Sequence, residues 1–168
     1  CLTVIRTLAR TGIAPEEVLS RANEHLLEQN REQMFVSLVL LHLDVRTGEI
    51  SAAVAGHPAG RIIRVDGSLE RALARTGPIL GVIAGAIWER TTCTLNIGDR
   101  LVLLTDGAFE ARDAKGTMLQ DEGVDKLLEN LPHATAARTA RHIAWAVRRR
   151  EGENPGDDLT VLVMRRLD

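Results

Sequence analysis

The architecture follows from two segments, Leu101-Val-Leu-Leu-Thr105-Asp106-Gly107 and Asn154-Pro-Gly-Asp157-Asp158-Leu-Thr160, the second leading into Val161-Leu-Val-Met164. Each joins a short apolar run, which predicts a β-strand, to aspartates at one end of that strand. Carboxylate oxygens are the ligands that Mg²⁺ and Mn²⁺ prefer. We therefore predict a carboxylate metal site that favours phosphoryl hydrolysis, although Asp-Gly is also a common turn dipeptide and paired acids often cap a turn.

Composition indicates an ordinary soluble globular protein. The chain has 168 residues, 45% hydrophobic and 26% charged, which is enough for one compact domain with its own core. Its formal charge of -2 gives no general attraction to nucleic acid, so no nucleic-acid partner is expected. The basic runs Arg148-Arg149-Arg150 and Arg165-Arg166 are expected to be solvated surface.

Cysteine and histidine patterns indicate neither a disulfide scaffold nor a zinc site. Cys1 and Cys93 belong to no CxxC pair, and the histidines lack zinc-ligand spacing. Apolar runs are short and no signal pattern occurs, so we expect a cytoplasmic protein without membrane attachment. Because the chain opens without methionine and at helical spacing, we expect it to be a fragment of a longer protein.

Hydrophobic periodicity and turn residues predict strands first, then helices, then a last strand, which is typical of an α+β fold with largely antiparallel sheets. The predicted elements are a helix over 15–32, a hairpin of 34–44 with 49–55, a strand over 60–65, a loop to Gly81, a hairpin of 87–95 with 100–105, helices over 120–130 and 134–149, and a strand from Val161.

Six local patterns occur in succession: Met34-Phe-Val-Ser37, Ala55-Gly-His-Pro58, Gly77-Pro-Ile-Leu-Gly81, Asn96-Ile-Gly-Asp99, Leu104-Thr-Asp-Gly-Ala-Phe-Glu-Ala111 and Asp157-Asp-Leu-Thr160. Their order resembles the SpoIIE/RsbU-like branch of PP2C-type (PPM) metal-dependent serine/threonine protein phosphatases. The likeness covers nearly the whole chain and implies an α-β-β-α sandwich. We therefore predict a single PP2C-like domain over 1–168.

The resemblance also implies a binuclear Mn²⁺ or Mg²⁺ centre. By position, Asp106 matches the metal-binding aspartate of the family's Thr-Asp-Gly element, and Asp157 matches a later metal-binding aspartate. Asp158 stands where eukaryotic relatives have asparagine and is a third candidate ligand, while Thr160 is expected to support the loop. Water activated by the metals attacks the phosphate ester, so no protein nucleophile is needed.

One family element has no counterpart in the chain: an earlier Asp-x-x-Gly-x-Gly, whose aspartate bridges both metals. Without that acid the site should hold a divalent ion weakly, so the 168 residues are expected to be weakly active or inactive. The predicted substrate is phosphoserine or phosphothreonine on an anti-sigma-factor antagonist. The alternative is a catalytically deficient interaction domain in a partner-switching pathway. A strand edge left open would invite a homodimer.

Other residues are weaker candidates. His57 could be a general acid for the leaving alkoxide, but a turn histidine bonded to backbone is the commoner case. Glu110 could orient a metal-bound water. The Gly77–Gly81 glycines match no phosphate-binding motif and predict a structural loop. Trp88 and Trp145 are expected to pack in a core or an interface. A haloacid-dehalogenase-like mechanism at Asp106 is disfavoured, because Ala108 stands where its second acid would be.

Overall fold

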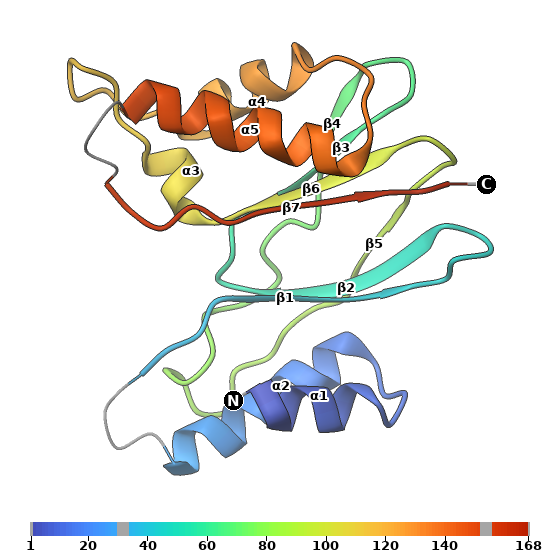
Figure 1. Cartoon of the computed structure of the whole chain (residues 1–168). Helices are drawn as coiled ribbons and strands as arrows, with labels where there is room; N and C mark the ends of the chain where they lie inside the picture. The colour runs from blue at the N-terminus through green and yellow to red at the C-terminus, as the bar shows by residue number, and fades with distance from the viewer. Residues whose placement is uncertain (1, 30–33, 152–155, 168) are drawn as a thin grey trace. The chain divides into compact units, whose positions relative to one another are not determined.

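The computed structural model describes residues 2–29, 34–151 and 156–167. The chain divides into two compact units, the first made of Cys1–His57 with Leu73–Thr94 and the second of Pro58–Ala72 with Leu95–Asp168. Each unit consists of an antiparallel sheet and the helices that pack on it (Figure 1). The predicted α+β class with antiparallel sheets is therefore confirmed.

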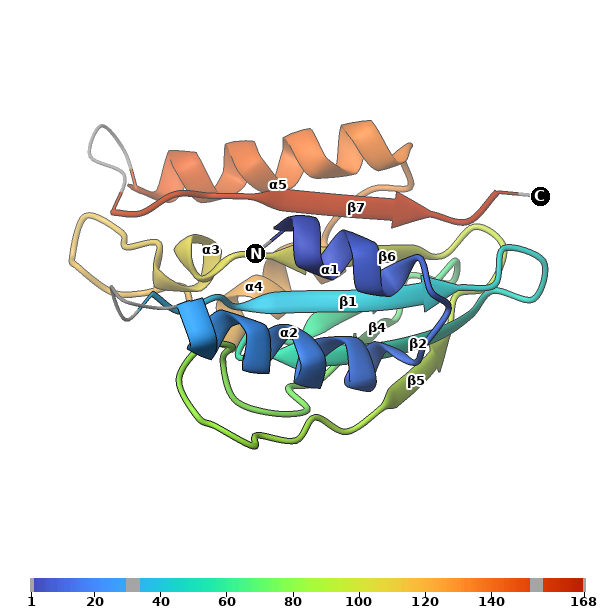
Figure 2. The ribbon, with the colours of Figure 1, turned by 90° about the horizontal axis from the view of Figure 1, so that it is seen from below.

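The first unit has a three-stranded sheet with two helices. Its elements are α1 (Leu2–Ala9), α2 (Pro15–Gln29), β1 (Leu38–Leu43), β2 (Glu49–Ala55) and β5 (Thr91–Thr94), in the strand order β1-β2-β5. The helices α1 and α2 lie side by side, and α2 packs on β1 and β2 (Figure 2). The predicted hairpin is confirmed, since β1 and β2 pair around a turn in which Gly48 has φ +80°.

Helix α2 forms where the sequence predicts it. Pro15 and the acids after it suit a first helical turn, and the apolar face of the helix is buried in the core of the unit. That core is made of Ile5, Val18, Leu19, Ala22, Ala53, Ala55, Leu80 and Trp88. The predicted end of the helix near residue 32 lies outside the described residues.

The second unit has a four-stranded sheet and three helices. Its elements are β3 (Gly60–Ile63), β4 (Leu69–Ala72), β6 (Arg100–Leu104), α3 (Asp106–Glu110), α4 (Gln120–Glu129), α5 (Ala136–Glu151) and β7 (Val161–Arg165), in the strand order β4-β3-β6-β7. All three helices lie on one face of this sheet (Figure 1). The apolar faces of α4 and α5 bury Val124, Leu128, Ile143 and Val147 against Ile63, Val102 and Leu104.

Ion pairs of a buried arginine connect α4 to the sheet. Arg61 on β3 is 1% exposed and its guanidinium bonds to the carboxylates of Asp121 and Asp125 on α4. The same guanidinium lies 5.3 Å from the centroid of the Phe109 ring. Burying this arginine is tolerable because two carboxylates and an aromatic face compensate its charge.

Three predictions about the elements were wrong. Segments 87–95 and 100–105 do not form a hairpin, because β5 pairs with β2 of the first unit whereas β6 pairs with β3 and β7 of the second. The region from 66 to 81, predicted to be loop, contains β4. Asp106, predicted at a turn, is the first residue of the short helix α3. The sequence also predicts that Asn154-Pro155 stops α5, and these two residues lie outside the described residues.

Candidate metal site

The antiparallel pairing of β6 and β7 brings the two predicted acidic segments to the same end of the sheet. In the register of the pair, Leu104 lies opposite Val161, so the residues that follow β6 and those that precede β7 are neighbours. Asp106 comes two residues after Leu104, and Asp158 three residues before Val161. Both segments belong to the second unit.

Thr105 fastens these segments together. Its hydroxyl donates to the carbonyl oxygen of Asp158 at 3.2 Å and accepts from the backbone N–H of Thr160 at 2.8 Å. Its own backbone N–H donates to the carbonyl oxygen of Thr160 at 3.2 Å. A threonine that precedes a helix usually caps the helix with its hydroxyl, but Thr105 makes no such bond to α3. Its hydroxyl instead fixes the position of the second acidic segment.

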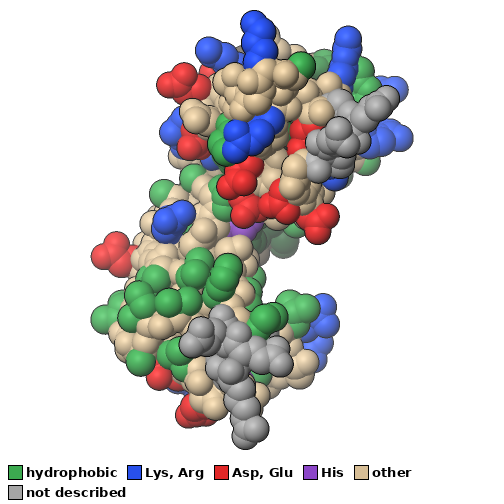
Figure 3. All heavy atoms as spheres, turned by 90° about the vertical axis from the view of Figure 1, so that its left-hand side faces the viewer, with side chains coloured by type: hydrophobic (Ala, Val, Ile, Leu, Met, Phe, Trp, Pro, Cys, Tyr) green, Lys and Arg blue, Asp and Glu red, His purple; other side chains and the backbone are tan. Residues whose placement is uncertain are grey.

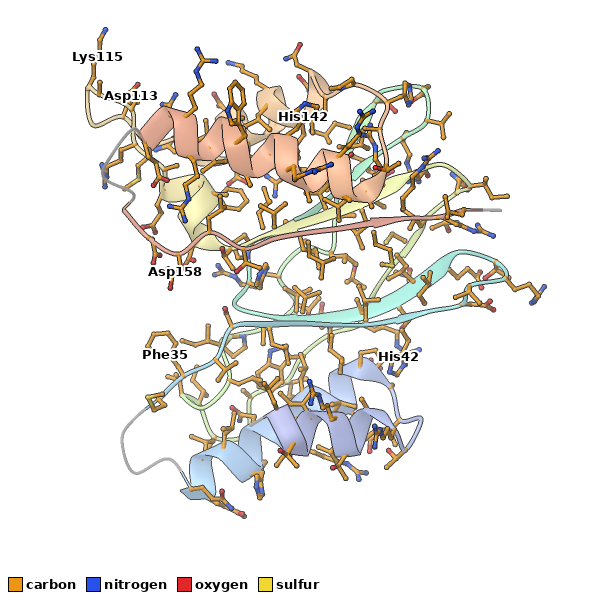
Figure 4. The ribbon with its side chains drawn as sticks, in the orientation of Figure 1. Phe35, His42, Asp113, Lys115, His142 and Asp158 are labelled. Atoms are coloured by element: carbon orange, nitrogen blue, oxygen red, sulfur yellow. The ribbon has the colours of Figure 1, made fainter. Side chains whose placement is uncertain are left out.

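Gly107 lets the two backbones approach closely. A Cβ at this position would lie 2.5 Å from the carbonyl oxygen and 3.0 Å from the carbonyl carbon of Asp158, so only glycine fits without a backbone shift. The Asp-Gly dipeptide therefore has a packing role here, because Gly107 makes room for the segment that carries Asp158. Asp158 itself is labelled in Figure 4, below α3.

The three candidate acids are exposed. Within the described residues, no Lys or Arg forms an ion pair with Asp106, Asp157 or Asp158, although four other aspartates of this unit are so paired: Asp99, Asp113, Asp121 and Asp125. One oxygen of Asp106 accepts from the Gly107 N–H at 3.1 Å, and one of Asp157 from the Asp158 N–H at 2.7 Å. Acidic side chains gather at this end of the unit (Figure 3).

The donor set suits a hard divalent cation. Exposed carboxylates without a basic partner offer oxygen ligands and leave room for the water molecules that Mg²⁺ and Mn²⁺ retain. In the part of the chain that the structure describes, no three His, Cys, Asp or Glu side chains are grouped closely enough to hold a metal ion. The assignment of Asp106, Asp157 and Asp158 as metal ligands stays a prediction.

The remaining candidates are His57, Glu110 and the Gly77–Gly81 loop. His57 is half-buried at the end of the first unit, following Gly56 with φ +63°, and Glu110 is exposed at the end of α3. Their catalytic roles stay predictions. The Gly77–Gly81 loop is held by internal contacts, since the Trp88 indole N–H donates to the Pro78 carbonyl and the Gly81 N–H donates to the side-chain oxygen of Asn23.

The two tryptophans differ. Trp88 is 2% exposed in the core of the first unit, as predicted. Trp145 is 58% exposed on α5, where the guanidinium of Arg149 lies 5.0 Å from its ring centroid, so it is not a core residue.

The role of Thr105 was missed by sequence reasoning. The prediction assigned loop support to Thr160, whose backbone does bond to Thr105, but it gave Thr105 no role of its own. The available signal was a threonine directly between a strand and an aspartate. Its hydroxyl partners lie more than fifty residues away, and only the strand pairing reveals them.

Comparison with known proteins identifies the family. The family model for stage II sporulation protein E (SpoIIE) matches residues 1–167. The chain belongs to the SpoIIE family. Among curated SpoIIE-like relatives, phosphoserine phosphatase RsbU of Bacillus subtilis (strain 168) is 27% identical over 171 residues, covering 99% of this chain and 50% of RsbU. The chain thus spans about half the length of that relative.

Solved structures confirm the predicted PP2C phosphatase fold for this SpoIIE-family chain. The PP2C phosphatase domain of SpoIIE from Bacillus subtilis, solved with a fragment of its regulatory domain, matches with a TM-score of 0.82 and 21% identity, covering 98% of this chain and 48% of that one. The catalytic domain of the serine/threonine protein phosphatase PstP, in complex with two manganese ions, matches with a TM-score of 0.65 and 18% identity, covering 91% and 70%.

Across residues 2–29, 34–151 and 156–167, every helix is too short or too polar to cross a bilayer.

Proposed function

We propose that the chain is part of the catalytic domain of a metal-dependent protein phosphatase that removes phosphate from phosphoserine or phosphothreonine. The observation that carries the proposal is the Thr105 link, which keeps the segments bearing Asp106 and Asp158 together at one end of β6 and β7. Membership of the SpoIIE family and the match to the phosphoserine phosphatase RsbU support the reaction type. Both compact units are proposed to belong to this one domain.

The aspartates would hold the cation. Asp106 and Asp157 each keep one carboxylate oxygen outside the bonds to the next residue's N–H, and Asp158 extends the same acidic segment. Mn²⁺ or Mg²⁺ bound there would lower the pKa of a coordinated water and so supply hydroxide near neutral pH. The protein would contribute by holding these acids in position. Thr105 bonds to the backbone of Asp158, and Gly107 lets that backbone approach closely.

Manganese is the better supported ion, because PstP was solved with it. We expect weak binding by this chain, since affinity for a hard cation rises with the number of anionic ligands and only three acids are assigned. Turnover by the 168 residues is accordingly expected to be low. A longer protein that supplies another acid to the site should be more active.

The proposed substrate is a phosphorylated regulatory protein of the anti-sigma-factor antagonist type, as the family resemblance implies. Dephosphorylation of such a protein would change its binding partner. A catalytically deficient domain that binds the same kind of protein without hydrolysing it is the second candidate. The phosphatase would hydrolyse the phosphoprotein and need the three acids to do so, whereas the second candidate would bind the phosphoprotein without turnover.

The experiment pairs metal binding with activity. The chain is titrated with Mn²⁺ while the backbone NMR signals of Gly107 and Leu159 are followed, because a paramagnetic ion broadens signals near it. Hydrolysis of a phosphoserine peptide is measured with Mn²⁺, with Mg²⁺ and with neither. We expect broadening at the site and hydrolysis only with a divalent ion.

Asp106→Asn and Asp157→Asn should abolish both broadening and turnover while the fold remains intact. Glu129→Gln removes one exposed negative charge from α4 of the same unit and serves as the matched control, with no expected effect. Broadening that survives in both aspartate variants would refute the ligand assignment. Specific broadening without hydrolysis, in a chain that still binds the phosphoprotein, would favour the non-catalytic candidate.

A further inference from the structure

A basic cavity lies at the other end of the β6–β7 pair, inside the second unit. Its volume is about 260 Å³. The residues that line it are Gly98, Arg100, His133, Ala134, Thr135, Arg138 and Arg165. Among the described residues, this lining contains three arginines and a histidine but no acid. The candidate metal site does not explain such a concentration of positive charge.

Two of these arginines face each other across the strands. Arg100, the first residue of β6, is the direct register partner of Arg165, the last residue of β7. Side chains of cross-strand partners emerge on the same face of the sheet, and like charges placed opposite each other destabilise the pair. The Arg100 guanidinium donates to the Thr139 hydroxyl of α5, so this shared face is the one that α5 covers.

Arg100 is deeply buried, and within the part of the chain that the structure describes it has no carboxylate partner. It is 3% exposed, and its bonds go to neutral oxygens, the Pro132 carbonyl at 3.0 Å and the Thr139 hydroxyl at 2.9 Å. Arg61, the other buried arginine of this unit, is compensated by two aspartates. Burial, followed by the positive charge of Arg165, lowers the pKa of Arg100, which is the effect of a charge that is neither solvated nor paired.

Two more groups direct positive charge into the cavity. Arg138, in the first turn of α5, is exposed and lines the cavity together with His133. The cavity also includes Thr135, which immediately precedes the sixteen-residue helix α5 and whose hydroxyl accepts from the Arg138 N–H at 3.3 Å. The helix dipole favours an anion at such a position.

We propose that this cavity binds a phosphate-type oxyanion, a tetrahedral dianion held between Arg100 and Arg165. Planar guanidinium groups bind such anions with paired hydrogen bonds, and the dianion would neutralise the repulsion between them. The cavity is slightly smaller than the range of about 300–1000 Å³ that holds drug-sized ligands, which suits a free ion or a terminal phosphate group. The site does not depend on the proposed phosphatase activity.

The test is a titration of the chain with inorganic phosphate at constant ionic strength and without divalent ions, followed by backbone NMR. We expect saturable shifts at Gly98 and Thr135. Sulfate should act similarly and acetate much more weakly. Phenyl phosphate separates the two sources of the group: tighter binding than phosphate indicates a phosphorylated ligand, and no binding indicates the free ion.

Arg165→Gln and Arg138→Gln should each weaken phosphate binding by about tenfold, as expected for loss of a charged hydrogen bond. Both side chains are exposed, so these variants should fold even if a change at the buried Arg100 does not. Arg149→Gln removes the same charge from the far end of α5 and should bind phosphate normally. Non-saturable shifts that chloride reproduces, or equal binding by all three variants, would overturn the proposal.

Discussion

Replacing Gly107 by alanine tests whether the close contact between the two acidic segments shapes the site. The added Cβ would lie 2.5 Å from the Asp158 carbonyl oxygen, far inside the roughly 3.5 Å of ordinary contact. Because the neighbour is backbone, one segment must move, and overpacking of this kind costs about 1–3 kcal/mol. Alanine also favours a helix by up to about 1 kcal/mol over glycine, which opposes the loss.

Gly123→Ala in α4 separates these two contributions. The three atoms nearest to its Cβ would all belong to the Leu119 side chain, with Cδ1 at 2.6 Å and Cγ at 2.9 Å, so a rotation of that side chain rather than a backbone shift can relieve the contact. Gly123→Ala should therefore keep the helical gain, while Gly107→Ala should be about 1–3 kcal/mol less stable than Gly123→Ala. Urea denaturation measures the difference, and Mn²⁺ titration of Gly107→Ala should show weaker binding. Equal stability of the two variants, with unchanged Mn²⁺ binding, would refute the contact.

Three further predictions concern buried or partly buried polar side chains and the stability of the fold. Arg61→Met should destabilise the fold by about 1–3 kcal/mol in urea, because Asp125 loses its bond to the buried guanidinium and keeps only Arg71 as a partner. Arg71→Met, which removes an exposed guanidinium, should cost about 1 kcal/mol or less. Burial raises the pKa of Asp125, but hydrogen bonds from Arg71 and Arg61 lower it overall, below the ordinary value of 3.8. The stabilisation of the fold by the ionised carboxylate is therefore complete above about pH 4 and is lost as pH falls through the folded-state pKa. Melting temperatures should consequently fall more steeply in acid for the wild type than for Asp125→Asn. Asn23→Leu should cost about 1–3 kcal/mol, since the fully buried Asn23 amide accepts from the Gly81 N–H, and a wild-type urea midpoint would contradict this.

Much of the fold could be predicted because its signals are local. The Arg46–Gly48 turn between two apolar runs predicts the β1–β2 hairpin, and the apolar stripe of residues 134–149 predicts α5. The acidic segments were recognisable because each adjoins a strand. Their meeting at one end of the sheet also required that β6 and β7 pair, which the sequence does not reveal.

The predicted hairpin of β5 with β6 does not form, which shows that local sequence signals do not determine which strands pair. The turn itself is real: the Asp99 side chain accepts from the backbone N–H groups of Asn96 and Val65. A turn fixes only the direction of the chain, however, and long-range packing selects the partner of each strand. The side chain of Asp99 also pairs with Arg64, which ties the turn to β3's end of the sheet rather than to β5.

The arginine-lined cavity could not be predicted from the sequence either. Arg165 was predicted to be solvated surface. Arg100 directly follows the predicted Asn96–Asp99 turn, and no role in a site was predicted for it. Only the register places them opposite each other, and only the packing of α5 buries one of them.

The lengthwise arrangement of charge on β6 and β7 has a consequence for how their ends communicate. Aspartates lie next to one end of the β6–β7 pair, and Arg100 and Arg165 lie at the other end. About 17–20 Å of extended chain separates the aspartates from these arginines. In physiological salt the Debye length is about 8 Å, so an ion captured at one terminus is electrostatically hidden from the other. Any influence between them would then have to pass mechanically along the strands. In about 0.01 M salt the Debye length is about 30 Å, so each terminus would feel the charge of the other directly.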